Sequence, residues 1–131
     1  MKTARIIALT LLFFVALSSL VAGYLFITDP SGAALHIPVR WLLHSPFDDF
    51  FIPGIILFIV NGVLSLLAAA CTIWRIRTYP RMVSLQGILL TGWIVVQIIM
   101  LQQLLLLHLI YGGIGILLFI LGIKLKSNHH R

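Results

Sequence analysis

Long apolar segments separated by short polar stretches organise this chain. The first two, residues 6–28 and about 50–74, contain no charged side chain. Each is long enough for one helical crossing of a bilayer, which needs roughly 20 residues. A further apolar stretch from Met82 to Ile123 has 42 residues. As one helix it would extend about 63 Å, which is too long for one crossing and suits two.

The break in this stretch is predicted near Gln102 and Gln103, its most polar point, although no Gly or Pro marks a turn there. The predicted fold class is therefore all-α: one transmembrane domain over residues 1–131, an integral membrane four-helix bundle with a longer extracytoplasmic loop between helices 1 and 2. The spans are predicted at 6–28, 50–74, 82–101 and 104–123, with the outer loop at 29–49 and a cytoplasmic tail at 124–131.

Composition supports a membrane protein. Hydrophobic residues make up 61% of the 131 residues and charged residues only 9%, whereas soluble domains carry about 25% charged residues. A soluble chain this short could not hide so much apolar surface, so the lipid bilayer is the expected partner. The net charge of +6 is spread over short segments beside apolar runs. Nucleic-acid binding needs a gathered basic footprint and is not predicted.

Positive charges predict the orientation. Four crossings put eight of the nine Lys and Arg residues on one side, together with both chain ends. Only Arg40 falls on the other side, in the loop that also holds all three acids. Cytoplasmic segments of membrane proteins collect Lys and Arg. We therefore predict a multi-pass protein of the cell membrane, such as a bacterial inner membrane, with N-terminus and C-terminus in the cytoplasm.

The first span could instead be a cleaved signal peptide, because its start is basic and Val21-Ala22-Gly23 is a passable cleavage site. Its apolar run has 23 residues, more than the roughly 7–15 of a signal core. Cleavage would also leave three spans and put the new N-terminus outside. A retained first helix is the favoured interpretation.

The outer loop carries local structural signals. Asp29-Pro30-Ser31-Gly32 is typical of a type I turn. Residues 37–43 suit a short helix in the headgroup region, with Trp41 as an interfacial anchor. Ser45-Pro46-Phe47-Asp48 predicts the start of helix two, with Ser45 as N-cap. Pro53-Gly54 should then kink or loosen that helix.

Signatures of soluble enzymes are missing from the sequence, which contains no phosphate-binding glycine loop, Gly-x-Ser-x-Gly elbow or HExxH motif. No charged residue lies in the middle of a predicted span. This disfavours proton pumps and charge-coupled transporters, which commonly use buried ionisable residues. Cys71 is the one cysteine, so no internal disulfide forms. An enzyme is not the favoured interpretation, and no catalytic residue is predicted.

Neutral polar and small residues within the spans have two interpretations. Asn61 and Ser65 share one face of helix two, and Gln86, Trp93 and Gln97 share one face of helix three. Small residues let helices approach, and Asn or Gln can hydrogen-bond across the contact. Helix packing is the favoured interpretation, and a pocket lining is the alternative.

A candidate site is predicted at the outer face, where the topology gathers polar residues. The hypothesis is a shallow site for a metal, haem or quinone headgroup, with neutral imidazole as ligand or hydrogen-bond partner. The alternative is that polar side chains simply collect where the protein meets water. The histidine spacings match no metal-binding rule, so no metal ligand is assigned. The candidate cofactor-binding residues are His108, Tyr111, Gln97, Trp93 and His44.

The layout resembles that of small bacterial four-span proteins of the DoxX-like type. The resemblance rests on a long outer loop after helix one, then Pro53-Gly54-Ile55-Ile56-Leu57 and Asn61-Gly62 in helix two, and short later connections. It implies a four-helix membrane fold and, for some relatives, a link to quinone-dependent respiratory chemistry. It carries no catalytic residue across.

Three functions follow as hypotheses. The first is a non-enzymatic accessory or interaction subunit, as a homo-oligomer or with another membrane protein, and small-residue faces around Gly62 and Gly87 motivate it. The second is a binder of a lipophilic small molecule, such as quinone or haem, at the outer face. The third is a small transporter or channel subunit, which would need a polar path that four apolar helices seldom enclose.

Overall fold

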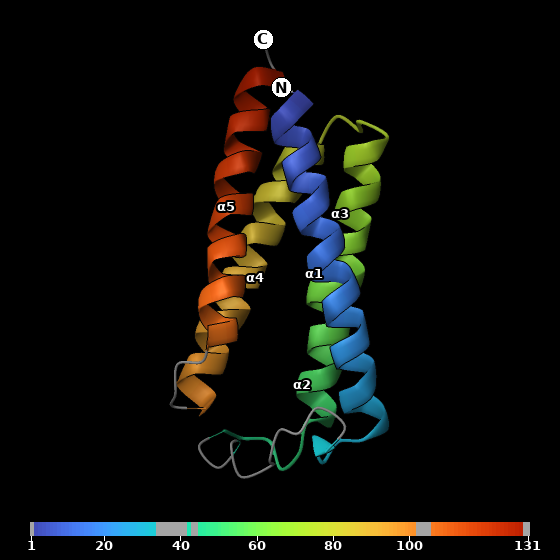
Figure 1. Ribbon diagram of the computed structural model, residues 1–131, viewed down its shortest axis with the longest axis vertical. Helices are drawn as coiled ribbons and strands as arrows, with labels where there is room; N and C mark the ends of the chain where they lie inside the picture. Colours follow the sequence, from blue (N-terminus) through green and yellow to red (C-terminus); the bar gives the residue numbers. More distant parts are fainter. Residues whose placement is uncertain (1, 34–41, 43–44, 102–105, 130–131) are drawn as a thin grey trace.

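The computed structural model describes residues 2–33, 42, 45–101 and 106–129. Four long helices run side by side, and both ends of the chain lie at the same end of the bundle (Figure 1). All four are long and apolar enough to cross a membrane, which confirms the predicted all-α four-helix class. The helical elements are α1 (Lys2–Thr28), then α2 (Phe51–Ile56), η3 (Leu57–Val63) and α3 (Leu64–Ile73) as one continuous span, then α4 (Tyr79–Leu101) and α5 (Leu106–His129).

The two last helices differ slightly from the predicted spans. α4 ends at Leu101 and α5 begins at Leu106, on either side of the predicted turn at Gln102 and Gln103, which lie outside the described residues. α5 continues to His129, beyond the predicted end of the span at residue 123. Leu125 explains this extension, because its side chain is 2% exposed and packs in the core. The predicted tail therefore begins as helix.

Helix two begins at Phe51, so the prediction of a helix start at Ser45 and Pro46 is wrong. The Ser45 hydroxyl instead accepts a hydrogen bond from the backbone N–H two residues later and donates to the carbonyl of Leu42. Asp49 Oδ1 accepts the Phe51 N–H at 3.0 Å, but the N-cap residue is Phe50, which makes no side-chain capping bond. Short polar side chains often form such local bonds in loops, so the sequence pattern alone does not decide where the helix begins.

The turn predicted after α1 is present. The Gly32 N–H donates to the Asp29 carbonyl at 3.1 Å, and Gly32 has a φ of 78°, which glycine adopts without strain. The Ser31 hydroxyl also donates to Asp29 Oδ1. The predicted interfacial helix with its anchor Trp41 falls almost wholly outside the described residues.

Helix two is not broken at Pro53-Gly54, where the sequence predicts a kink or a loosening. It changes from α-helix to π-helix at Leu57 and returns to α-helix at Leu64. A π-helix is wider than an α-helix because each hydrogen bond spans five residues, and π-helical turns inside α-helices are often found at functional sites. Asn61 and Gly62 lie within this wider segment.

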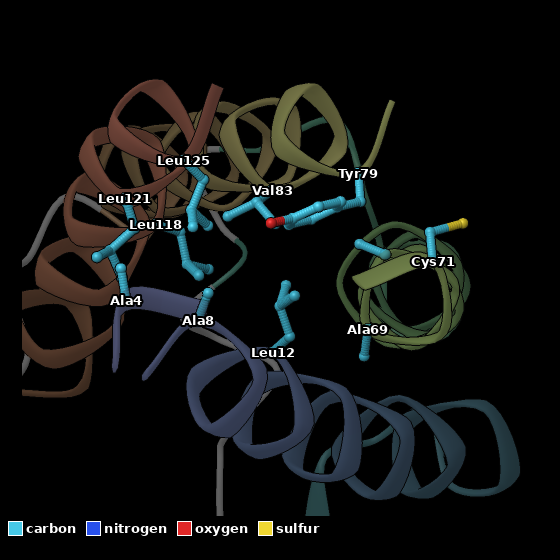
Figure 2. Packing of buried hydrophobic residues seen from close by; sticks show 11 residues of the cluster. Ala4, Ala8, Leu12, Ala69, Cys71, Tyr79, Val83, Leu118, Leu121 and Leu125 are labelled. Atoms are coloured by element: carbon cyan, nitrogen blue, oxygen red, sulfur yellow. The ribbon is translucent and has the colours of Figure 1, made fainter. Parts of the chain in front are cut away.

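The half of the bundle that contains both chain ends, here called the terminal half, is tightly packed. Figure 2 shows side chains from α1, α3, α4 and α5 gathered there. Ala8, Leu12, Val83 and Leu118 are each 0% exposed, so they are removed from lipid and water alike. The full cluster is Ala4, Ala8, Leu12, Ala68, Ala69, Cys71, Tyr79, Val83, Leu118, Leu121 and Leu125.

Glycines bring α4 and α5 into backbone contact. A Cβ at Gly87 would lie 2.5 Å from the carbonyl oxygen of Gly115 and 2.5 Å from the backbone nitrogen of Phe119. Such distances leave no room for any side chain at Gly87. The Ser84 hydroxyl adds a hydrogen bond to the Phe119 carbonyl at 3.2 Å. Close approach of small residues is a general way to pair helices in lipid, and here it joins α4 and α5 into one hairpin.

Toward the connection between α1 and α2, the bundle divides into two pairs. α2 packs against α1, and the α4–α5 hairpin diverges from that pair (Figure 1). We call this part the loop half. It contains the end of α1, all of α2, the end of α4 and the start of α5.

Candidate functional site

A cavity of about 310 Å³ lies in the loop half, between the α1–α2 pair and the α4–α5 hairpin. Ligand sites in proteins have volumes of roughly 300–1,000 Å³, so this space suits a small molecule or the head of a larger one. Most of its wall is apolar, with a few polar groups among the lining residues. The lining residues are Ser18, Ser19, Ala22, Phe26, Leu42, Phe50, Pro53, Leu57, Asn61, Leu90, Trp93, Ile94, Gln97, Met100, Leu107, His108 and Tyr111.

Four of the five predicted site residues share this cavity. Trp93 and Gln97 reach it from α4, and His108 and Tyr111 reach it from α5. The fifth, His44, lies outside the described residues. The antiparallel hairpin explains the gathering, because the end of α4 and the start of α5 necessarily meet at one end of the bundle.

Asn61 is a polar residue of the cavity wall that the predicted site omitted, as it also omitted Ser18 and Ser19. Its side chain is 0% exposed and lines the cavity from the π-helical segment. Neither Oδ1 nor Nδ2 has a hydrogen-bond partner within the described structure. Burying an amide without such partners costs a few kcal/mol. The sequence singled out Asn61 as a mid-span polar residue, but it did not decide between helix packing and a pocket.

Trp93 contributes a second unpartnered group. Its indole Nε1 is buried and donates to none of the described atoms. Indole N–H is a donor only, whereas the Asn61 amide offers both an acceptor and donors. The cavity wall thus contains buried donors and an acceptor that the described protein atoms do not use.

Tyr111 has a different role, because its hydroxyl is already engaged. It donates to Ser18 Oγ at 2.9 Å and so ties α5 to α1 across the cavity. Its ring also stacks on Phe14, with centroids 5.8 Å apart. Ser18 in turn donates to the Phe14 carbonyl at 2.8 Å. Tyr111 is therefore part of the wall that holds the two helix pairs together.

The cavity is bounded at both ends by packed side chains. On the loop side, the rings of Phe26 and Phe50 stack with centroids 4.7 Å apart, and Leu42 beside them is 3% exposed. On the other side, the Gln86 amide donates from α4 to the Val60 carbonyl of the π-helical segment at 2.9 Å. This hydrogen bond agrees with the helix-packing interpretation of Gln86.

His108 is 4% exposed and is the one histidine that the described cavity wall contains. Among the described residues, no group of three or more His, Cys, Asp or Glu side chains lies close enough together to hold a metal ion. The polar groups of the described wall are amide, indole, imidazole and hydroxyl groups, and no Asp, Glu, Lys or Arg is among its described residues.

Comparisons with family models, with curated proteins and with solved structures find no match to this chain. The resemblance to DoxX-like proteins rests on the sequence pattern alone and stays a prediction. Function is therefore inferred from the cavity and its polar groups.

Proposed function

We propose that this protein binds a lipophilic small molecule with a polar head, such as a quinone, in the cavity of the loop half. The observation that carries the proposal is the buried Asn61 amide, which lacks a partner among the described residues and lines that cavity. A ligand head that hydrogen-bonds to this amide would remove the cost of burying it. The apolar remainder of the wall would accept the rest of the ligand.

The polar groups also define the head that fits. Quinone carbonyls accept hydrogen bonds, and the Asn61 amide and the Trp93 indole can both donate them. A quinol hydroxyl could donate to Asn61 Oδ1 instead. The same two residues therefore suit either oxidation state. Haem is the less favoured ligand, because His108 is the one described side chain in the wall with a nitrogen suited to iron.

Two features favour binding over the rival hypotheses. The small-residue faces that suggested a protein partner are used inside the bundle, where Gly62 faces Leu20 and Gly87 faces the backbone of Gly115 and Phe119. A channel would need a polar path from end to end, and the core cluster fills the terminal half. An interaction subunit would have to use other surfaces.

Tryptophan fluorescence tests the proposal. Trp93 lines the cavity, whereas Trp74 is 73% exposed at the other end of the bundle. A short-chain quinone added to the purified protein is expected to quench emission to saturation near one equivalent. In a Trp41→Phe background, which leaves two tryptophans, Trp93→Phe should remove the saturable part, and the matched control Trp74→Phe should keep it. Linear quenching that is equal in both variants would show only partitioning into detergent and would refute the proposal.

The purified protein offers a second readout. Organic extraction followed by mass spectrometry is expected to recover a lipophilic molecule in a fixed ratio to protein. A visible absorbance band of iron porphyrin would favour haem over quinone. A protein that carries neither molecule and shows no saturable quenching would not support this function.

We further propose that the protein lies in the cell membrane with both ends in the cytoplasm, on the basis of the charge distribution. Ser31 and Thr78 are exposed in connections at opposite ends of the bundle. In a Cys71→Ala background, Ser31→Cys is expected to react with a membrane-impermeant maleimide in intact cells. Thr78→Cys should react only after permeabilisation. The reverse pattern would invert the orientation.

A further inference from the structure

A second, smaller recess of about 200 Å³ lies at the terminal end of the bundle. It is formed by the α3–α4 connection, the first turn of α4 and the last turns of α5. Three of the five residues around it are cations. We call it the basic recess, and its residues are Arg77, Thr78, Pro80, Arg81 and Lys126.

Helix packing explains why these cations converge. A Cβ at Gly122 would lie 2.7 Å from the Pro80 carbonyl oxygen, so α5 crosses close to the first turn of α4. Lys126 follows Gly122 by four residues, which is about one helical turn on the same face. The close crossing therefore places Lys126 beside the residues that begin α4. Lys126 of α5 therefore lines the same recess as Arg77 and Arg81.

No acidic side chain offsets these charges. The chain has three acids, Asp29, Asp48 and Asp49, and all follow α1 or precede α2 at the opposite end of the bundle. Like charges gathered around a concave space create a positive potential that attracts an anion. Basic pockets between membrane helices bind phosphate-containing lipid headgroups for this reason.

We propose that the basic recess binds the phosphate of an anionic phospholipid. Arg77, Arg81 and Lys126 would pair with the phosphate charge, and the Thr78 hydroxyl would supply a neutral donor. The surroundings favour a lipid over a free ion. Ile123 lies one turn before Lys126 on α5 and is 51% exposed, so it offers apolar surface to an acyl chain beside the headgroup.

Native mass spectrometry of the full chain in detergent tests this site, with phosphatidylglycerol as the probe. The site variant is Arg81→Gln with Lys126→Gln. The matched control is Arg75→Gln with Lys124→Gln, which removes the same charge from exposed residues at the same end but outside the recess. For the first bound lipid, the dissociation constant of the site variant is expected to be about tenfold higher than that of the wild type. The control variant should bind as tightly as the wild type. All these side chains are exposed, so circular dichroism should show unchanged helix content.

Each other outcome has a definite meaning. Equal weakening in both double variants would indicate diffuse attraction and overturn the proposal, as would no weakening in either. Equal affinity for phosphatidylcholine would overturn the preference for an anionic lipid. If inorganic phosphate displaced the lipid at an equal concentration, the recess would bind phosphate as proposed. The proposal that the phosphate belongs to a lipid would then be rejected. Quinone quenching of Trp93 should be unchanged in the site variant, so this test is independent of the cavity.

Discussion

Gly87→Leu is expected to lower the free energy of unfolding by about 3 kcal/mol or more, since extra side-chain volume in a closely packed contact typically costs 1–3 kcal/mol even where neighbouring side chains can move. At Gly87 the neighbours are the Gly115 carbonyl and the Phe119 nitrogen, each 2.5 Å from the position of a Cβ. Backbone atoms of a helix cannot rotate away as a side chain can. The hairpin must therefore open for leucine to fit.

Thermal unfolding in detergent, followed by circular dichroism, measures this effect. Gly92→Leu is the matched control, because Gly92 lies in the same helix and a Cβ there would meet no described atom within 4 Å. In that variant stability should fall little or even rise, since leucine is a better helix former than glycine. Similar losses in both variants would mean that glycine itself, and not the contact with α5, determines the stability of α4.

Asn61→Leu is expected to change ligand binding and protein stability in opposite directions. Quinone affinity should fall at least tenfold, because the ligand head loses its amide partner while it is desolvated. The ligand-free protein should gain about 1 kcal/mol of unfolding free energy, because an apolar side chain of similar size replaces a buried amide with no described partner. Quinone titration and thermal unfolding of the same preparation would measure both.

Ser65→Ala separates the two effects. Ser65 is also 0% exposed, and its Oγ also lacks a partner within the described residues, but it does not line the cavity. Its substitution should leave quinone affinity unchanged. If Asn61→Leu destabilised the protein and bound quinone as tightly as the wild type, the amide would serve the fold and not the ligand.

The architecture could be predicted because few physical quantities determine it. Segment length against bilayer thickness gives four helices, and the turn at Asp29–Gly32 follows from residues with strong local preferences. The start of helix two could not be predicted, because Ser45 forms its hydrogen bonds within the loop and the helix begins without a side-chain cap. The loop residues Leu42 and Phe50 are 3% and 6% exposed, and such tertiary packing is not readable from a local sequence pattern.

The candidate site was predictable where topology alone brings residues together, as for Trp93 and His108. The contribution of α1 to the site could not be predicted. Ser18 donates a hydrogen bond to the carbonyl four residues earlier, as serine commonly does in membrane helices, so its sequence position gives no sign of a further partner. Asn61 and Gln86 look equivalent in sequence, since both are side-chain amides within apolar runs. The structure gives Gln86 a carbonyl partner and leaves Asn61 without a described one.

The glycine contacts between α4 and α5 have a mechanical consequence. Because these helices touch through their backbones, neither can shift alone, so any tilt of α4 about the packed core of the terminal half would carry α5 with it. A helix of 23 residues such as α4 is about 35 Å long. A tilt of about 3° would therefore displace its far end by roughly 1–2 Å. Such a tilt would change the width of the cavity, and the hydrogen bond from Tyr111 to Ser18 limits how far it can go.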